Sequence, residues 1–154
     1  MKRAVIIYGA PGAGKGTQAN LLSAAKGLIH FDTGKFLELI VHDKDEQKDP
    51  EIKKEAKLFD TGKLLSPTWV LKIVKEKTGE IAKAGFGVVY SGSPRTLYEA
   101  FGSIYDPDSG EKIPSMTGKS DKSAVGLPAV ASAEVGGLIE FLESAYGKKN
   151  ISII

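Results

Sequence analysis

Residues 3–17 read Arg-Ala-Val-Ile-Ile-Tyr-Gly-Ala-Pro-Gly-Ala-Gly-Lys-Gly-Thr, and this stretch decides the fold. Residues 4–8 are continuously apolar and rich in β-branched side chains, a pattern typical of a strand buried on both faces of a parallel sheet. A glycine-rich turn follows, and residues 17–26 then place Ala19 and Leu22 at helical spacing before Gly27. The stretch therefore predicts a strand, a loop and a helix in succession, which is the building unit of α/β proteins.

The glycine-rich turn contains the pattern G-x-x-x-x-G-K between the expected strand and helix. Glycines let backbone N–H groups converge on phosphate oxygens, and the helix N-terminus adds the positive end of its dipole. A turn that was merely tight would require neither Lys15 nor so many glycines. Lys15 is the expected catalytic cation, reaching the β and γ phosphates. The residues expected to bind the triphosphate are Gly12, Ala13, Gly14, Lys15, Gly16 and Thr17.

The rest of the chain alternates between strands and helices. Apolar runs predict further strands over 28–31, 87–91 and 151–154. Helical spacing predicts helices over 33–42, 50–60, 67–84 and from about Ala133 to 146, with Trp69 in the core. We therefore expect an α/β fold of the P-loop NTPase type, with a parallel sheet in the order two, three, one, four and helices on both faces.

Residues 101–132 differ in composition from the chain on either side. They are rich in Gly, Pro, Ser, Asp and Lys and contain few periodic apolar residues, which favours an inserted flexible segment. Within it, the turn sequence Asp-Pro-Asp-Ser-Gly favours a β-hairpin over 104–113. We expect one domain over 1–154 that carries this insertion.

Composition excludes several function classes. The chain has 154 residues, with 21 Lys and Arg against 19 Asp and Glu, so it is neither a nucleic-acid-binding polycation nor an acidic tail. It has no cysteine and two histidines, which excludes disulfides and makes a zinc site improbable. No apolar run reaches the length of a membrane span, so we expect a cytoplasmic protein with neither a membrane nor a nucleic-acid partner.

Four motifs in the first hundred residues together resemble one family. Residues 9–17 look like the P-loop of adenylate kinases and their nucleoside monophosphate kinase relatives. Asp-Thr-Gly-Lys at 32–35 resembles that family's Ser-Thr-Gly-Asp, and Gly-Lys-Leu-Leu at 62–65 its Gly-Lys-Leu-Val. Gly-Ser-Pro-Arg-Thr at 92–96 resembles its Gly-Phe-Pro-Arg-Thr. The motifs also stand in the family's order.

The resemblance implies a function and a role for individual residues. It implies transfer of the terminal phosphate of ATP, with Mg²⁺, to a nucleoside monophosphate of the AMP type, by a monomer whose partners are small nucleotides. Residues 32–66 would form the acceptor-binding subdomain, and Arg95 would clamp the acceptor phosphate as a second catalytic cation. The metal would be held through Thr17 and Asp32. The expected acceptor-binding residues are Thr33, Gly34, Lys35, Lys63, Leu65, Gly92, Arg95 and Glu99.

Three departures from the family pattern favour an alternative function. Glu38 stands where an acceptor-phosphate arginine is expected, and Ser91 stands where the family has a strand-end aspartate. The only arginines in the chain are Arg3 and Arg95, so an arginine-bearing lid is missing. Lys35 and Asp32 are the available substitutes for the lost cation and carboxylate. The alternative is a catalytically weak or inactive nucleotide-binding protein, or a truncated fragment that lacks the lid.

Glu99 bears on the choice of base. It stands where the family reads adenine with glutamine. A carboxylate has no proton to donate to N1 of adenine, whereas it can accept from both N1–H and N2–H of guanine. The sequence therefore predicts an acceptor base that is not strictly adenine, unless Glu99 points into solvent.

Overall fold

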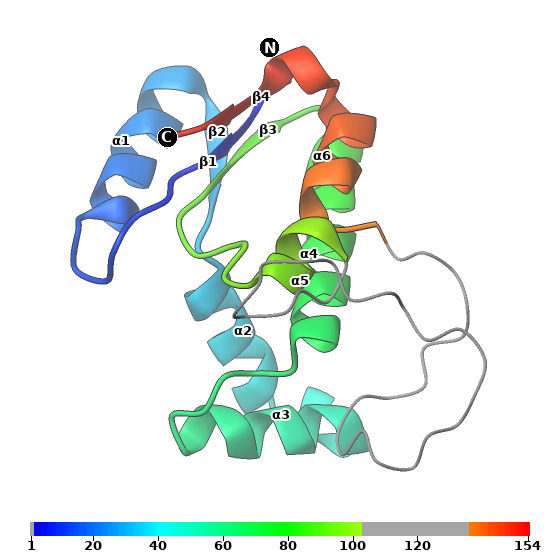
Figure 1. The fold of residues 1–154 in the computed structure, drawn as a ribbon. Coiled ribbons are helices and arrows are strands. Elements are labelled where there is room, and N and C mark those ends of the chain that lie inside the picture. The colour runs from blue at the N-terminus through cyan, green and yellow to red at the C-terminus, as the bar shows by residue number, and fades with distance from the viewer. Residues whose placement is uncertain (1, 103–135) are drawn as a thin grey trace, which may run out of the picture.

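The computed structural model describes residues 2–102 and 136–154, and its centre is a parallel sheet with helices on both faces (Figure 1). The strand order is β2-β3-β1-β4, and β1 pairs in parallel with both β3 and β4. The α/β class and the sheet order predicted from the sequence are therefore confirmed. The strands are β1 Ala4–Ile6, β2 Leu28–Phe31, β3 Gly87–Tyr90 and β4 Ile151–Ile153.

The long helices follow the predicted alternation, with two shifted starts, and the short helix after β3 was not among the predicted helices. The first helix begins at Lys15 rather than at residue 17, because Gly14 adopts a left-handed conformation that lets the helix start there. The last begins at Leu138, whereas a start near Ala133 was expected; Ala133 lies outside the described residues. The α-helices are α1 Lys15–Lys26, α2 Thr33–His42, α3 Pro50–Asp60, α4 Pro67–Lys83, α5 Leu97–Phe101 and α6 Leu138–Tyr146, and the short 3₁₀ turns are η1 Glu46–Lys48 and η2 Lys148–Asn150.

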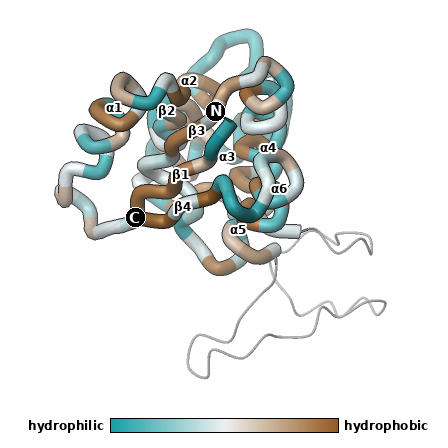
Figure 2. The backbone as a smooth tube through the Cα atoms, turned by 90° about the horizontal axis from the view of Figure 1, so that it is seen from above, coloured by the Kyte–Doolittle hydropathy of each residue, from teal (hydrophilic) through white to brown (hydrophobic). Residues whose placement is uncertain are grey.

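Helices cover the sheet unequally on its two faces. On one face, α1 packs Ala19 against the strand residues Val5 and Val89. On the other face lie α4 and α6, and Trp69 is buried there as predicted. Successive residues of a strand point to opposite faces, so β1 and β3 contribute to both cores. Figure 2 shows the result: the strands near the middle of the molecule are apolar, and polar stretches lie around them.

Two parts of the sequence analysis meet the limits of the described residues. The hairpin expected over 104–113, and the inserted segment from residue 103 onward, lie outside them. Within 2–102 and 136–154, no helix has the length and apolar character needed to cross a membrane.

The start of α6 depends on a close approach to α5. A Cβ atom built on Gly137 would collide with the backbone of α5 at the Ala100 carbonyl and the Phe101 nitrogen. Neither group belongs to a flexible side chain, so the two helix ends can meet only if residue 137 is glycine.

We expect Gly137→Ala to lower the free energy of unfolding by about 1–3 kcal/mol, the usual cost of overpacking an interior. Gly136→Ala is the matched control, because the three atoms nearest to its Cβ all belong to the flexible side chain of Glu140. Urea denaturation of both variants tests the expectation. Equal stability of Gly137→Ala and the unchanged chain would contradict the tight contact between α5 and α6.

Candidate functional site

The loops that follow β1, β2 and β3 meet at one edge of the sheet. Because these strands run parallel, their carboxyl ends lie side by side, and open α/β sheets bind ligands at that edge. The glycine-rich loop follows β1, α2 begins after β2, and residues 91–96 follow β3. All three segments lie below the strands in the view of Figure 1.

The glycine-rich loop has a backbone that only glycine adopts readily. Gly12 and Gly14 have φ angles of 78° and 81°, in the left-handed region. A Cβ on either residue would meet no protein atom within 4 Å, so the space in front of the loop is open. Conformation, rather than crowding, therefore requires glycine at these positions, as in a backbone arrangement that turns N–H groups toward an anion.

Lys15 folds back over this loop from the first turn of α1. Its Nζ donates to the carbonyl oxygens of Gly9 and Ala10, both at 2.8 Å. These two hydrogen bonds hold the ammonium group against the carbonyl groups at the start of the loop. Thr17, two residues on, is exposed on the same turn of the helix.

A cavity of about 320 Å³ lies beside the loop after β3, between α2 and the connection from α3 to α4. This volume is within the range of small-molecule sites. Apolar side chains supply much of its wall, and Lys63 and Arg95 supply positive charge. It is lined by Thr33, Gly34, Leu37, Phe59, Gly62, Lys63, Leu64, Leu65, Val70, Arg95 and Glu99.

Arg95 is positioned in the cavity by its own loop and by two glycines. Its Nε donates to the carbonyl oxygen of Gly92 at 2.9 Å. Its Nη2 lies 3.3 Å from where a Cβ on Gly34 would be, and 3.4 Å from a Cβ on Gly92. The absent side chains of these glycines leave room for the planar guanidinium, whose donors suit a phosphate or carboxylate.

Two buried polar side chains also line the cavity. Thr33 is 1% exposed, and its Oγ1 has no hydrogen-bond partner among the described residues. Glu99 is 5% exposed, so it does not point into solvent. Burial raises the pKa of the Glu99 carboxyl, an effect opposed by the hydrogen bond from the Arg95 backbone and by the Arg95 charge.

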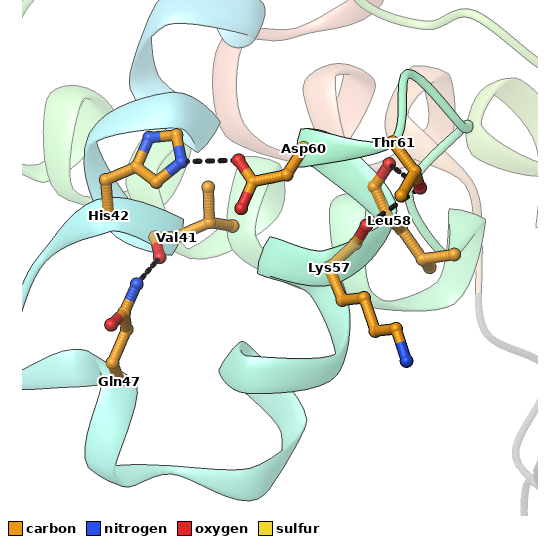
Figure 3. A network of polar contacts seen from close by, with 7 residues as sticks. All are labelled: Val41, His42, Gln47, Lys57, Leu58, Asp60 and Thr61. Carbon is orange, nitrogen blue, oxygen red and sulfur yellow. Dashed lines mark hydrogen bonds and ion pairs between the residues drawn. The ribbon is translucent and has the colours of Figure 1, made fainter.

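The part of the cavity wall that Phe59 of α3 forms is held in place by contacts within and between α2 and α3 (Figure 3). His42 Nε2 lies 2.8 Å from Asp60 Oδ1, and the His42 ring meets Phe59 edge to face. At the end of α3, Thr61 Oγ1 donates to the carbonyl oxygen of Lys57 at 2.8 Å. Since Phe59 lines the cavity, these contacts fix the wall as well as the helix ends.

The structure gathers most, but not all, of the residues predicted to bind the acceptor. Thr33, Gly34, Lys63, Leu65, Arg95 and Glu99 line the one cavity. Gly92 lies behind Arg95 and holds its Nε. The Lys35 side chain is 81% exposed and does not line the cavity, so the structure does not place it as the substitute cation.

Asp32, predicted as a metal ligand, has a local partner. It is the N-cap of α2, and its Oδ1 accepts from the Lys35 backbone N–H at 3.3 Å. Within 2–102 and 136–154, no three His, Cys, Asp or Glu side chains group as a metal cage. The other oxygen of Asp32, Oδ2, lies 3.8 Å from Lys35 Nζ. A hydroxyl and a carboxylate are oxygen donors of the kind that Mg²⁺ accepts, so the chemistry of Thr17 and Asp32 fits the ion, which would have to displace Lys35 from Asp32.

A family model with the description "AAA domain" matches residues 8–106, which contain both the glycine-rich loop and the cavity. The chain belongs to the AAA domain family. Its P-loop, identified from the sequence as the strongest motif, is part of the matched region.

Curated relatives of this AAA domain are named adenylate kinase. The protein from Prochlorococcus marinus (strain MIT 9211) is 40% identical over 100 residues, covering 65% of this chain and 50% of that protein. The protein from Francisella philomiragia is 38% identical over 98 residues, covering 62% and 42%. The resemblance to adenylate kinases is thus confirmed, and the chain spans about half the length of these relatives.

This AAA domain also contains a row of three hydrogen-bonded side chains that was not predicted from the sequence. His30, on β2, lies between α1 and the end of β3: its Nδ1 is 2.6 Å from Asn20 Oδ1, and its Nε2 is 2.7 Å from Ser91 Oγ. With the Asn20 oxygen facing the ring, a neutral imidazole donates from Nδ1 and accepts the Ser91 hydroxyl at Nε2. The only sequence signal was Ser91, in place of the family's aspartate.

Burial makes this imidazole favour its neutral form. It lowers the pKa of His30, an effect opposed by the negative charge of Asp32 and aided by the positive charge of Lys35. As the pH falls, the unfolded chain is therefore protonated before the folded one. Stability from His30 is complete above its unfolded pKa of about 6.5 and is lost as the pH falls below it.

We expect the free energy of unfolding to fall between pH 7.5 and pH 5.5, and His30→Gln to reduce this fall. His42→Gln is the control, because His42 is the other histidine of the chain and lies in a half-exposed pair with Asp60. Urea denaturation at a series of pH values measures both. An identical pH dependence in the unchanged chain and in His30→Gln would contradict the neutral, partly buried imidazole.

Proposed function

We propose that this chain transfers the terminal phosphate of ATP to a nucleoside monophosphate. The observation that carries the proposal is the meeting of a P-loop and an arginine-bearing cavity at one edge of the sheet. The cavity supplies a second site beside the first, which a protein that only hydrolyses triphosphate would not need. The adenylate kinase names of the relatives support the same reaction class.

The P-loop serves as the donor site in this proposal. The amides of residues 12–17 would face the phosphates, and the N-terminus of α1 would add its dipole. Lys15 would leave the carbonyl oxygens of Gly9 and Ala10 and turn its ammonium group to the β and γ phosphates. Mg²⁺, when bound, would neutralise charge on those phosphates, with Thr17 and Asp32 as the chain's ligands.

The cavity serves as the acceptor site. Arg95 would bind the acceptor phosphate through its fork of N–H donors, with Lys63 as a second charge. Apolar walls from Leu37, Leu65 and Val70 would take up the nucleoside and exclude water. Transfer would then be in line, driven by positioning and charge neutralisation without a covalent intermediate.

The proposal also assigns one part of the chain to the acceptor. Residues 32–66 would act as the acceptor-binding subdomain of one domain over 1–154. Support comes from the cavity wall, much of which belongs to α2, α3 and the residues that follow α3. Of the insertion predicted over 101–132, Phe101 instead ends α5 and Gly102 is its C-cap, and the rest remains a proposal.

A second candidate is a protein that binds nucleotides without transferring phosphate efficiently. The observation that favours it is Ser91, which lies at the end of β3 bonded to His30, where the family pattern has a carboxylate. A hydroxyl carries no charge with which to attract a metal-bound water. Weak metal binding would follow.

A transfer assay distinguishes the two candidates. The chain is incubated with ATP, Mg²⁺ and each of AMP, GMP, CMP and UMP, and nucleoside diphosphates are quantified by ion-exchange chromatography, with EDTA as the control. With GMP, CMP or UMP as the acceptor we expect ADP and the second diphosphate in equal amounts, and with AMP two ADP for each ATP consumed; EDTA should abolish all of these products. Binding of ATP and a monophosphate without diphosphate formation would overturn the kinase proposal in favour of the binding protein.

A further inference from the structure

Glu99 places a carboxylate in the wall of the cavity, among apolar side chains, two cations and the Thr33 hydroxyl. The side chain is 5% exposed and comes from α5, whose N-cap is Thr96. Burying a carboxylate is costly unless donors surround it. Its position in a ligand-sized cavity leaves the acceptor positions that the chain itself does not use available to a ligand.

The local hydrogen bonds satisfy only part of the carboxylate. Oε2 accepts from the Arg95 backbone N–H at 3.0 Å, and the Glu99 backbone N–H donates to Thr96 Oγ1 at 3.1 Å. The Thr96 side chain also hydrogen bonds to the carboxylate. A carboxylate has about four acceptor positions, so about half of its capacity is left for a ligand.

We infer that the cavity recognises a nucleobase with two adjacent N–H donors, namely guanine, through the carboxylate of Glu99. This inference rests on the proposed function, since it names the acceptor of that same site. The unpartnered Thr33 Oγ1 is a second polar atom of the wall, able to donate to or accept from the ligand.

The donor and acceptor patterns of the bases separate the candidates. Guanine presents N1–H and N2–H side by side, which matches the two oxygens of a carboxylate. Adenine presents an acceptor at N1 next to its N6 donors, so one carboxylate oxygen would face a lone pair. Uracil and cytosine each offer a donor with acceptors beside it. Guanine is the base whose edge leaves neither oxygen unpaired.

The test compares binding of GMP, inosine monophosphate and AMP by isothermal titration calorimetry at pH 7.5, with the full chain. We expect GMP to bind roughly tenfold or more tightly than AMP, since an unpaired buried polar contact has about that effect. Inosine monophosphate keeps N1–H and lacks the 2-amino group, so we expect it to bind between the two.

Glu99→Gln is the decisive variant. The glutamine carbonyl oxygen can still accept from the Arg95 N–H, so the start of α5 is preserved, while one acceptor becomes a donor. We expect the preference for GMP to disappear or reverse. Glu76→Gln makes the same chemical change on the exposed surface of α4 and is expected to leave the preference intact.

The possible outcomes distinguish a failure of this inference from a failure of the proposed function on which it rests. If no monophosphate binds, the acceptor site itself is refuted. If monophosphates bind with AMP preferred, and Glu99→Gln leaves that preference unchanged, the acceptor site stands and the role of Glu99 is overturned. Thermal melting of Glu99→Gln close to that of the unchanged chain confirms that folding is not the cause.

Discussion

Lys15→Met lowers the rate of phosphoryl transfer roughly 10²- to 10³-fold, the expected result of removing one preorganised charge from the reacting phosphates. Methionine keeps the length and apolar stem of lysine and removes only the ammonium group. In the structure that group lies across the loop, 2.8 Å from the carbonyl oxygens of Gly9 and Ala10. Without it, backbone dipoles alone would face the β and γ phosphates.

Steady-state transfer rates and ATP titration calorimetry measure the effect of Lys15→Met. Lys26→Met is the matched control: it removes the same group from the exposed last turn of the same helix, far along α1 from the loop. Circular dichroism checks that both variants are folded. Unchanged ATP affinity and rate in a folded Lys15→Met protein would refute the donor role of the P-loop.

The sheet could be predicted from the sequence because its signals are local. Residues 4–8 are apolar without interruption, and the G-x-x-x-x-G-K pattern follows them directly. Both features lie within one strand–loop–helix unit, so no distant residue is needed to interpret them. The parallel order then follows from the alternation of strands and helices.

The partners of the site residues could not be predicted, because they are set by tertiary packing. His30 bonds to Asn20, ten residues away, and to Ser91, sixty-one residues away, and no spacing in the sequence links the three. Glu99 is buried through the hydrogen bond of its carboxylate with Arg95 N and the packing of a five-residue helix. Sequence periodicity over so short a helix does not show which face is covered.

The same limit explains the shifted start of α6. The apolar spacing of residues 133–146 permits a longer helix, and the prediction gave no weight to Gly136 and Gly137, which are poor helix formers. The contact of Gly137 with the backbone of Ala100 and Phe101 fixes where the helix begins. That contact depends on where α5 ends, which is set some 36 residues earlier in the chain.

Arg95 supplies the guanidinium of the cavity. Arg3, the other arginine of the chain, precedes β1 and therefore lies at the opposite end of that strand. The Nε of Arg95 is anchored on the Gly92 carbonyl, and its Nη2 lies against Gly34. The remaining N–H donors are oriented before any ligand arrives. Preorganised donors cost little reorganisation when the phosphate binds.

We therefore expect Arg95→Ala to lower kcat/KM for the monophosphate roughly 10²- to 10³-fold while ATP affinity stays the same. Arg95→Lys restores the charge without the planar fork and should recover only part of the loss. Arg3→Ala is the control for removing an arginine elsewhere. Transfer kinetics at varied monophosphate and saturating ATP separate the effects. An Arg95→Ala protein that keeps its kcat/KM would refute the role of Arg95 as the phosphate clamp and would leave Lys63 as the cation for the acceptor phosphate.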